Sequence, residues 1–236
     1  MQFNIDAMVK SILYSIHYLG ITLLIPLVAL AIGIVFGLVI ALLRYYQAKV
    51  IAPVLQAIVT LFKGIPIVLI LLAMYLFCST AFDPIAQSLH WSIRFKNVNT
   101  IWIAIVGLGI MAIVNASEIF RGAFASIRKG QLDAAQSIGM TRGQTIRRVL
   151  LPEAIPVALP VLGNLLINLI KASALCSMVG VVDIFSAATI SGQQSYSFLE
   201  AYVGVALIYW AVVVCIEKGT GLVEHRLTSR LGRAAQ

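Results

Sequence analysis

Ionisable residues are scarce in this sequence, and three of them, Lys63, Glu118 and Lys171, interrupt long apolar runs. A charged side chain among apolar ones needs a polar partner, water, or a reach to a headgroup layer. Asn164 and Asn168 are four residues apart, so we expect them to share a helix face that points at protein or water. Such residues bind and orient polar groups. They form no catalytic set, and the sequence contains no phosphate-binding loop and no metal-ligand spacing.

Lys63 and Glu118 each allow two interpretations. Lys63 is followed by Gly64 and Pro66, and a proline removes a backbone donor and can break a helix, so that freed carbonyls line a cavity. Lys63 therefore either sits at a gate or snorkels to the headgroups. Glu118 precedes Arg121 by three residues, which allows an ion pair within one helix. The alternative for Glu118 is a gating contact with another helix.

Lys171 lies nineteen residues after Pro152. In a helix that distance is about 28 Å at a rise of 1.5 Å per residue. Lys171 would then lie near the far end of its helix, where it either snorkels or contacts an anionic group.

The composition predicts an all-α integral membrane protein. Of the 236 residues, 61% are hydrophobic and 11% are charged, against roughly 25% charged in soluble domains. A soluble chain could not bury that much apolar surface. In lipid the backbone must satisfy its own hydrogen bonds, which long apolar runs achieve as helices.

Five segments reach the length of about 20 residues that a helix needs to cross a bilayer. We expect a single transmembrane domain over residues 1–236, with spans at about 12–43, 52–78, 98–121, 153–181 and 198–217. With the N-terminus outside, 12 of the 17 Lys and Arg fall on inner segments. Basic residues favour the cytoplasmic side, so we predict the N-terminus outside and the C-terminus in the cytoplasm. The outer stretch 180–197 could be a short helix or a loop.

The longest inner segment lies between the third and fourth spans. Residues 132–138 can form about two helical turns, with Asp133 in the first turn, where a negative charge suits the helix dipole. Gly139 can end this helix in a left-handed conformation. A second short basic helix would start at Thr141, and Pro152 could open the fourth span.

This inner segment resembles the EAA loop of permeases that work with ATP-binding-cassette (ABC) ATPases. Asp133-Ala134-Ala135 is followed by three residues, Gly139, nine residues, and Val149-Leu150-Leu151-Pro152. The resemblance implies the type I ABC importer fold and a cytoplasmic coupling helix at about residues 131–140. It also implies that Asp133, Ala134, Ala135 and Gly139 contact a cleft in the ATPase.

A longer stretch is similar to the polar amino acid branch of this family. The residues that carry the likeness are Ser117–Ala123, Ser126–Gln131, Leu159–Asn164 and Leu169–Lys171. Three positions depart from the branch, because Ile65, Ile70 and Ala172 stand where it often has Thr, Gln and Asp. These departures bear on the substrate, since an ammonium group in a membrane cavity needs acceptors or a counter-ion.

The resemblance implies a permease subunit for a polar or sulfur-containing amino acid, or a related amphoteric solute. The chain would be a multi-pass protein of the bacterial cytoplasmic (inner) membrane, with no enzymatic activity and no cofactor of its own. A separate ATPase would bind ATP and Mg. Further partners would be a second permease subunit, an extracytoplasmic solute-binding protein and membrane lipid, but no nucleic acid. The candidates for the pathway or its gate are Lys63, Gly64, Pro66, Glu118, Asn164, Asn168, Lys171, Ala172 and Ser173.

Two other classes remain as hypotheses. An ion-coupled secondary transporter would act without an ATPase, but it predicts acidic groups in mid-span, whereas Glu118 and Glu200 lie near predicted span ends. A membrane enzyme has less support, because the sequence shows no catalytic constellation.

Overall fold

The computed structural model describes residues 3–234, and side chains as far as Glu224. Within that range every regular element is a helix. In chain order the elements are α1 (Ile5–Ile16), α2 (Leu19–Tyr45), α3 (Ile51–Gly64), α4 (Ile67–Ser88), η1 (Phe95–Asn97), α5 (Ile101–Ala125), α6 (Lys129–Ser137), α7 (Arg142–Thr145), the π turn η2 (Ile146–Leu150), α8 (Leu151–Ser173), the 3-10 turn η3 (Ala174–Val179), α9 (Ile184–Ser195) and α10 (Phe198–Ala234).

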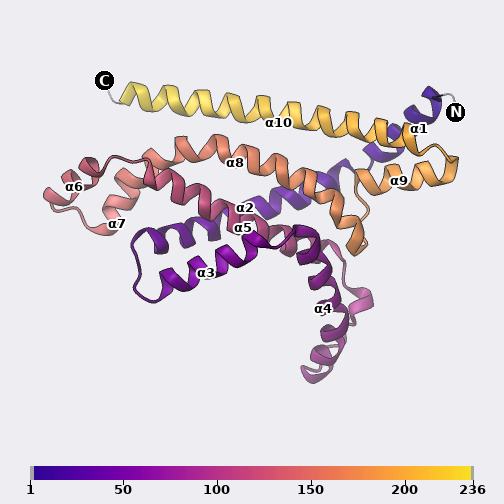
Figure 1. Ribbon diagram of the computed structural model, residues 1–236, viewed down its shortest axis with the longest axis horizontal. Coiled ribbons are helices and arrows are strands. Elements are labelled where there is room, and N and C mark those ends of the chain that lie inside the picture. The colour runs from indigo at the N-terminus through magenta and orange to yellow at the C-terminus, as the bar shows by residue number, and fades with distance from the viewer. Residues whose placement is uncertain (1–2, 235–236) are drawn as a thin grey trace.

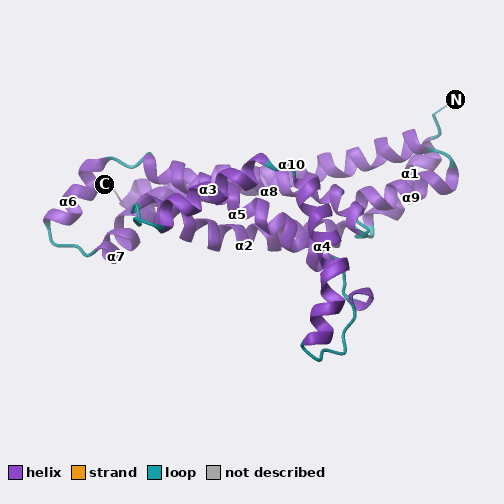
Figure 2. Ribbon diagram, turned by 60° about the horizontal axis from the view of Figure 1, so that its bottom comes forward, coloured by secondary structure: helices purple, strands orange, loops and turns teal. Residues whose placement is uncertain are grey.

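The long helices α2, α5, α8 and α10 run along the longest axis of the molecule (Figure 1). The two short helices α6 and α7 lie at one end, where α10 also ends, and α1 and α9 lie at the other end (Figures 1 and 2). Helix α4 leaves this bundle and projects sideways. The start of α1 and the end of α10 are therefore at opposite ends of the bundle.

The centre of the bundle is the close contact between α2 and α5. A Cβ atom added at Gly33 would lie 2.6 Å from the Ala112 Cβ, and one added at Gly37 would lie 2.7 Å from the Ala116 Cβ. Small residues at these positions let the two backbones approach each other, which is how helices pack in lipid without a hydrophobic driving force. The Gly-x-x-x-Gly pair is thus a packing feature.

Among the residues that the structure describes, five helical segments are long and apolar enough to cross a membrane, by length and composition. The predicted span at about 52–78 differs from the structure, because α3 ends at Gly64 and α4 starts at Ile67. The cause is Pro66, which has no N–H for a continuing helix. Ile65 and Pro66 are extended, with ψ of 125° and 138°. The continuous apolar run that predicted one span therefore forms two separate helices.

Two other predicted spans are also divided. The segment 12–43 is split at His17 and Tyr18 between α1 and α2, and the segment 153–181 changes from α8 to η3 after Ser173. The stretch 180–197, for which helix and loop were both open, contains helix α9. The Asn115 side chain of α5 donates to the Met111 carbonyl of its own helix at 2.8 Å.

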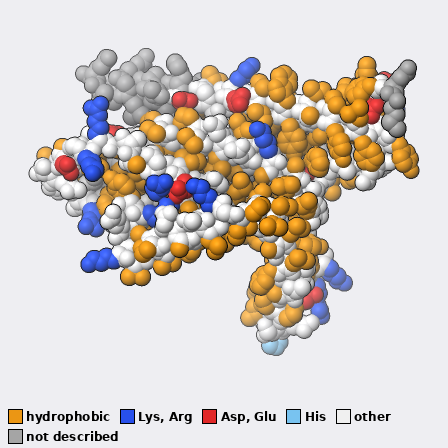
Figure 3. Space-filling view, in the orientation of Figure 1, with side chains coloured by type: hydrophobic (Ala, Val, Ile, Leu, Met, Phe, Trp, Pro, Cys, Tyr) orange, Lys and Arg blue, Asp and Glu red, His pale blue; other side chains and the backbone are white. Residues whose placement is uncertain are grey.

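Apolar surface is distributed unevenly over the helices. The most apolar window of α5 is 61% buried within the chain, and that of α4 is 11% buried. Hydrophobic side chains cover the projecting α4 and much of the face in Figure 3. A soluble monomer rarely exposes such patches, so this surface is a contact for lipid or protein.

Candidate functional site

Residues 126–150, which join α5 to α8 and contain α6 and α7, lie at one end of the bundle, and we call this segment the knob (Figure 1). Helix α6 begins at Lys129, earlier than predicted. The prediction that Asp133 lies in the first turn is therefore wrong, because Asp133 is the fifth residue of α6. Gly139 adopts a left-handed φ of 78°, as predicted. Its N–H donates to the Gln136 carbonyl at 2.9 Å, and the Met140 N–H donates to the Ala135 carbonyl at 3.1 Å. These bonds end α6 sharply, and glycine favours that backbone conformation because it has no Cβ.

A second short helix follows, also as predicted. Thr141 caps α7 by a reciprocal pair of bonds with Gln144: the Thr141 hydroxyl accepts from the Gln144 N–H at 3.4 Å, and the Gln144 side chain accepts from the Thr141 N–H at 2.9 Å. Pro152 is the second residue of α8, close to the predicted start of the fourth span. The chain from α7 through η2 thus passes without a loop into α8.

Exposure separates the predicted coupling residues. Asp133 and Ala134 are exposed, as is Gly139, whereas Ala135 is 4% exposed and faces its own chain. Ile138 is 74% exposed at the tip of the knob, although it is a large apolar side chain.

A cluster of four charged side chains joins three helices near the same end of the bundle. Glu118 of α5 lies 2.7 Å from Arg44 of α2, 3.0 Å from Arg121 of its own helix and 3.8 Å from Lys63 of α3. The Arg44 side chain is 5% exposed and also donates to the Gln56 amide oxygen of α3. Glu118 therefore pairs within its own helix, with Arg121, and across helices, with Arg44.

Helix α3 contacts this cluster through Lys63 and Gln56. Val59 is its one buried residue, and Gly64, at its end, has open space around it. The Lys63 side chain is 62% exposed but reaches Glu118. The roles of Arg44 and Gln56 were not predicted, because in the sequence Arg44 has the position of a loop charge, and its partners are set only when α2, α3 and α5 pack together.

A stripe of exposed residues runs along α8. Asn164, Asn168 and Lys171 are exposed and spaced by four and three residues, so they share one helix face. Val157 and Val161, each 47% exposed, continue the same spacing towards the start of α8. The stripe is therefore apolar in its first half and polar in its second half. Exposed amides on a membrane helix require protein or water opposite them.

The remaining pathway candidates fall outside this stripe or at its edge. Ala172 is half-buried, and Ser173 is fully buried and donates to the Ile170 carbonyl at 2.8 Å. Of the positions that depart from the amino acid branch, Ile70 is 7% exposed and Ile65 is half-buried at the break before α4.

A buried carboxylate at the opposite end was not found from the sequence. Asp183 is fully buried and caps α9 by accepting from the Ser186 N–H at 2.9 Å, while the Tyr209 hydroxyl donates to it at 3.2 Å. Next to it, the Ile184 N–H donates to the Thr22 hydroxyl of α2 at 3.1 Å. Burial raises the pKa of Asp183, and the bonds from Ser186 and Tyr209 oppose that rise. These bonds anchor α9 to α2 and α10.

No group of three or more His, Cys, Asp and Glu residues in the described part of the chain could hold a metal ion. The polar features are a knob at one end, an ionic cluster beside it and a stripe along one helix. Together they suit binding, docking and movement of helices.

Comparison with known proteins identifies the family. Residues 33–229 match the family described as the binding-protein-dependent transport system inner membrane component. The probable amino-acid ABC transporter permease protein YckA of Bacillus subtilis (strain 168) is 35% identical over 210 residues, which cover 89% of this chain and 87% of YckA.

Solved structures agree with this assignment. A chain in the crystal structure of an amino acid ABC transporter with histidines superposes with a TM-score of 0.79 at 30% identity, and the match covers 96% of this chain and 100% of that one. A chain of the MetNI methionine ABC transporter in an inward-facing conformation shares the fold, with a TM-score of 0.72 at 24% identity over 91% of this chain and 96% of that one. This multi-pass inner-membrane chain therefore belongs to the binding-protein-dependent transport system inner membrane component family, as an ABC importer permease.

Proposed function

We propose that this chain forms half of the translocation pathway of an ABC importer for an amino acid or a related amphoteric solute. YckA is described as a probable amino-acid transporter permease, and the solved relative is described as an amino acid transporter with histidines. Both descriptions support an amino acid as the solute. The knob of α6 and α7 is the cytoplasmic end, the N-terminus is outside, and an extracytoplasmic binding protein delivers the solute. Family membership favours this mechanism over an ion-coupled transporter acting alone.

The observation that carries the proposal is the knob, which presents Asp133, Ala134 and Ile138 outside the bundle. The tip inserts into a cleft of the ATPase, where burial of the exposed Ile138 side chain would be favourable. The ATPase, not this chain, binds ATP and Mg. Ala135 does not contact the ATPase directly, because it is buried between α6 and the rest of its own chain, where it holds α6 in place.

The stripe on α8 lines the pathway, with a second permease subunit opposite. Residues spaced alternately by three and four form a seam that suits a facing copy of the same helix. Asn164 and Asn168 hold polar parts of the solute, and Lys171 contacts its carboxylate. Val157 and Val161 narrow the inner half. The buried Ile70 lies outside the pathway, so its departure from the branch does not alter the lining.

Helix α3 acts as the inner gate. It is hinged at Gly64 and Pro66 and attached through Lys63 and Gln56 to the charges around Glu118. When the ATPases move the knobs, these contacts exchange and α3 swings. Alternating access requires two such arrangements, each favoured by a different ligand state.

The first experiment tests docking through Ile138→Ser in the tagged complex. The substitution removes an exposed side chain, so the chain itself should keep its stability. We expect co-purified ATPase to fall at least tenfold, which corresponds to about 1.4 kcal/mol of lost contact. The matched control is Gln136→Ser, which is also exposed on α6. Equal ATPase recovery in both variants would exclude Ile138 as a docking residue.

Gly139→Leu tests the shape of the knob. Nothing lies within 4 Å of a Cβ at Gly139, so the effect comes from its left-handed backbone, which costs a residue with a Cβ about 1–2 kcal/mol. We expect uptake to fall sharply. The control is Gly130→Leu, which also meets open space but lacks the positive φ. Normal uptake and ATPase association in the Gly139 variant would contradict the coupling role.

Ala172→Asp tests the substrate assignment. If this position borders the pathway, the new carboxylate provides a counter-ion for an ammonium group. We expect the ratio of cationic to neutral amino acid uptake to rise. An unchanged ratio, with normal assembly, would remove Ala172 from the pathway.

A further inference from the structure

A 3-10 turn separates the end of α8 from helix α9. This turn is η3 (Ala174–Val179), which is six residues long and directly follows Lys171, Ala172 and Ser173. Runs of 3-10 helix longer than three or four residues are uncommon, because their hydrogen bonds have poorer geometry than those of an α-helix. The turn therefore depends on contacts with other elements, and such a stretch often marks a hinge.

One tyrosine of α10 contacts both ends of this turn. The Tyr209 hydroxyl donates to the carboxylate of Asp183, which follows the turn, at 3.2 Å. It also interacts with the hydroxyl of Ser173, the residue before the turn. Asp183 and Ser173 are both fully buried, so water does not compete for either contact. We call these two contacts the Tyr209 bridge.

The end of the turn at Asp183 is fixed to the rest of the bundle. The Asp183 carboxylate also accepts from the Ser186 N–H at 2.9 Å, at the start of α9. The next N–H, that of Ile184, donates to the Thr22 hydroxyl of α2 at 3.1 Å. Because α2 packs closely on α5, this end has a fixed position.

The end of the turn at Ser173 has an alternative bond. Its hydroxyl donates to the Ile170 carbonyl of its own helix at 2.8 Å. A hydroxyl has a single proton, so Ser173 can donate to Ile170 or to Tyr209 but not to both. The contact between Tyr209 and α8 can therefore open while both hydroxyls keep a partner, Ser173 in Ile170 and Tyr209 in Asp183.

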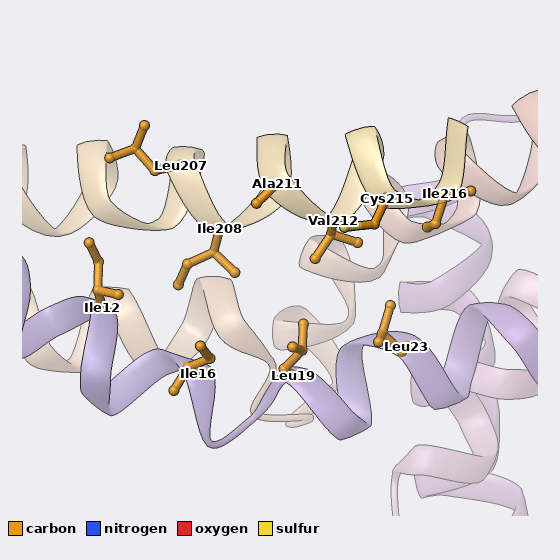
Figure 4. A pocket seen from close by; sticks show the side chains of 10 residues that line it. All are labelled: Ile12, Ile16, Leu19, Leu23, Leu207, Ile208, Ala211, Val212, Cys215 and Ile216. Carbon is orange, nitrogen blue, oxygen red and sulfur yellow. The ribbon is translucent and has the colours of Figure 1, made fainter. Parts of the chain in front are cut away.

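The opposite face of α10 offers no comparable polar contact in this region. Ile208 and Ala211, on either side of Tyr209, line an apolar groove of about 540 Å³ that separates α10 from α1 and the start of α2 (Figure 4). The walls of this groove are hydrocarbon apart from the Cys215 thiol. Here α10 is therefore held to its neighbours by packing and by the Tyr209 hydroxyl.

We propose that Tyr209 is a positioning residue of the pathway, because its bridge holds η3 in the 3-10 form and thereby sets where Lys171 lies. Through the contact of Lys171 with the solute, this role rests on the proposed function. Six residues rise about 12 Å as a 3-10 helix and about 9 Å as an α-helix. Release of the bridge lets η3 continue α8 as α-helix, which moves Lys171 by about 3 Å and rotates it by about a third of a turn relative to Asp183.

The test is the reactivity of the Lys171 amine in the purified complex in lipid nanodiscs. Sulfo-N-hydroxysuccinimide acetate acetylates exposed lysines, and peptide mass spectrometry gives the rate at Lys171 relative to Lys96, an exposed lysine of η1. In Tyr209→Phe we expect this ratio to fall about threefold or more, because the loss of a buried hydrogen bond lets the ammonium rotate away from the exposed face of α8. The matched control is Tyr202→Phe, which removes a hydroxyl from the same helix at a residue that is 41% exposed.

Ser173→Ala removes the other partner of the bridge and should also lower the ratio. The double variant Ser173→Ala with Tyr209→Phe should lower it no further than Tyr209→Phe alone, because both changes act on one contact. The control is Ser177→Ala, since the Ser177 hydroxyl also donates to the carbonyl three residues before it, at 2.8 Å. If the Tyr209 variant does not assemble, the comparison of Ser173→Ala with Ser177→Ala decides in its place.

An unchanged ratio in Tyr209→Phe, or additive effects in the double variant, would overturn the proposal. Uptake of the protein amino acids and cystine by the same variants, in vesicles with the ATPase and the binding protein, tests the proposed function separately. A lower Lys171 reactivity together with a raised KM would support both. A lower reactivity with an unchanged KM would support the positioning role of Tyr209 and remove Lys171 from contact with the solute.

Discussion

The pair of helices α2 and α5 and the arm formed by α3 and α4 differ in where their apolar residues make contacts. Glycines on α2 meet alanines on α5 so closely that neither helix can move without the other. The arm buries little in its own chain, and its apolar residues point outward. The difference separates a closely packed frame from an arm whose apolar surface is left for lipid or for another protein.

The largest effect is expected in the frame. Gly37→Leu places a side chain where even a Cβ would lie 2.7 Å from the Ala116 Cβ and 2.9 Å from the Ser117 backbone nitrogen. Backbone cannot yield, so we expect little folded protein, measured as the monodisperse fraction after detergent extraction. Gly20→Leu, on the same helix with open space around it, should express normally. Normal yield of the Gly37 variant would break the comparison.

Glu118→Gln tests the ion pairs that connect α5 to α2 and α3. It leaves the buried Arg44 guanidinium without its carboxylate, and breaking a buried ion pair in this way costs about 3 kcal/mol. We expect a clear fall in thermal stability of the complex. The double variant Glu118→Met with Arg44→Met should recover part of the loss, because the unpaired charge is gone. A double variant less stable than the single one would contradict this account of the cluster.

Phe77→Ala tests whether the arm is covered by another subunit. Phe77 is 68% exposed on α4, so its truncation should leave the isolated chain as stable as before. If a partner covers it, assembly should weaken by about 1–3 kcal/mol. The measurement is the dissociation of permease dimers on dilution in detergent, with Trp102→Ala as control, since Trp102 is 63% exposed on α5. Equal dissociation in both would place α4 in lipid.

The smallest effect on stability is expected for Lys63→Met. The Lys63 ammonium is largely exposed and 3.8 Å from Glu118, and such pairs contribute less than about 1 kcal/mol. Stability should hardly change, while the uptake rate should change if α3 is the gate. Arg121→Met is the matched control, because Arg121 pairs with Glu118 without leaving α5. A similar change of rate in both variants would remove the special role of the arm.

Local signals in the sequence were sufficient for the break between α6 and α7, although they placed the start of α6 too late. Gly139, Thr141 and Pro152 end, cap and start helices through bonds within a few residues, and all three behave as predicted. The pair of Glu118 with Arg121 is local as well. Family resemblance supplied the meaning of the knob, which the local signals alone do not carry.

Features that depend on packing between distant segments were not predicted. Arg44 meets Glu118 only because α2 and α5 lie side by side, and Asp183 meets Tyr209 only because α9 folds back on α10. The break at Pro66 was recognised, but its consequence was not, because hydropathy measures how apolar a segment is and not its direction. Ile138 was overlooked since apolar residues are assumed to be buried.

The continuity of α7, η2 and α8 has a mechanical consequence. Since no loop separates the knob from the helix that carries Asn164, Asn168 and Lys171, α8 can serve as a lever pivoted near the end that we propose is cytoplasmic. Lys171 is about 30 Å from Leu151 at 1.5 Å per residue, so a tilt of about 5° displaces it by about 3 Å. That displacement is about the length of a hydrogen bond. A small rotation imposed at one face of the membrane can thus release a solute held near the other.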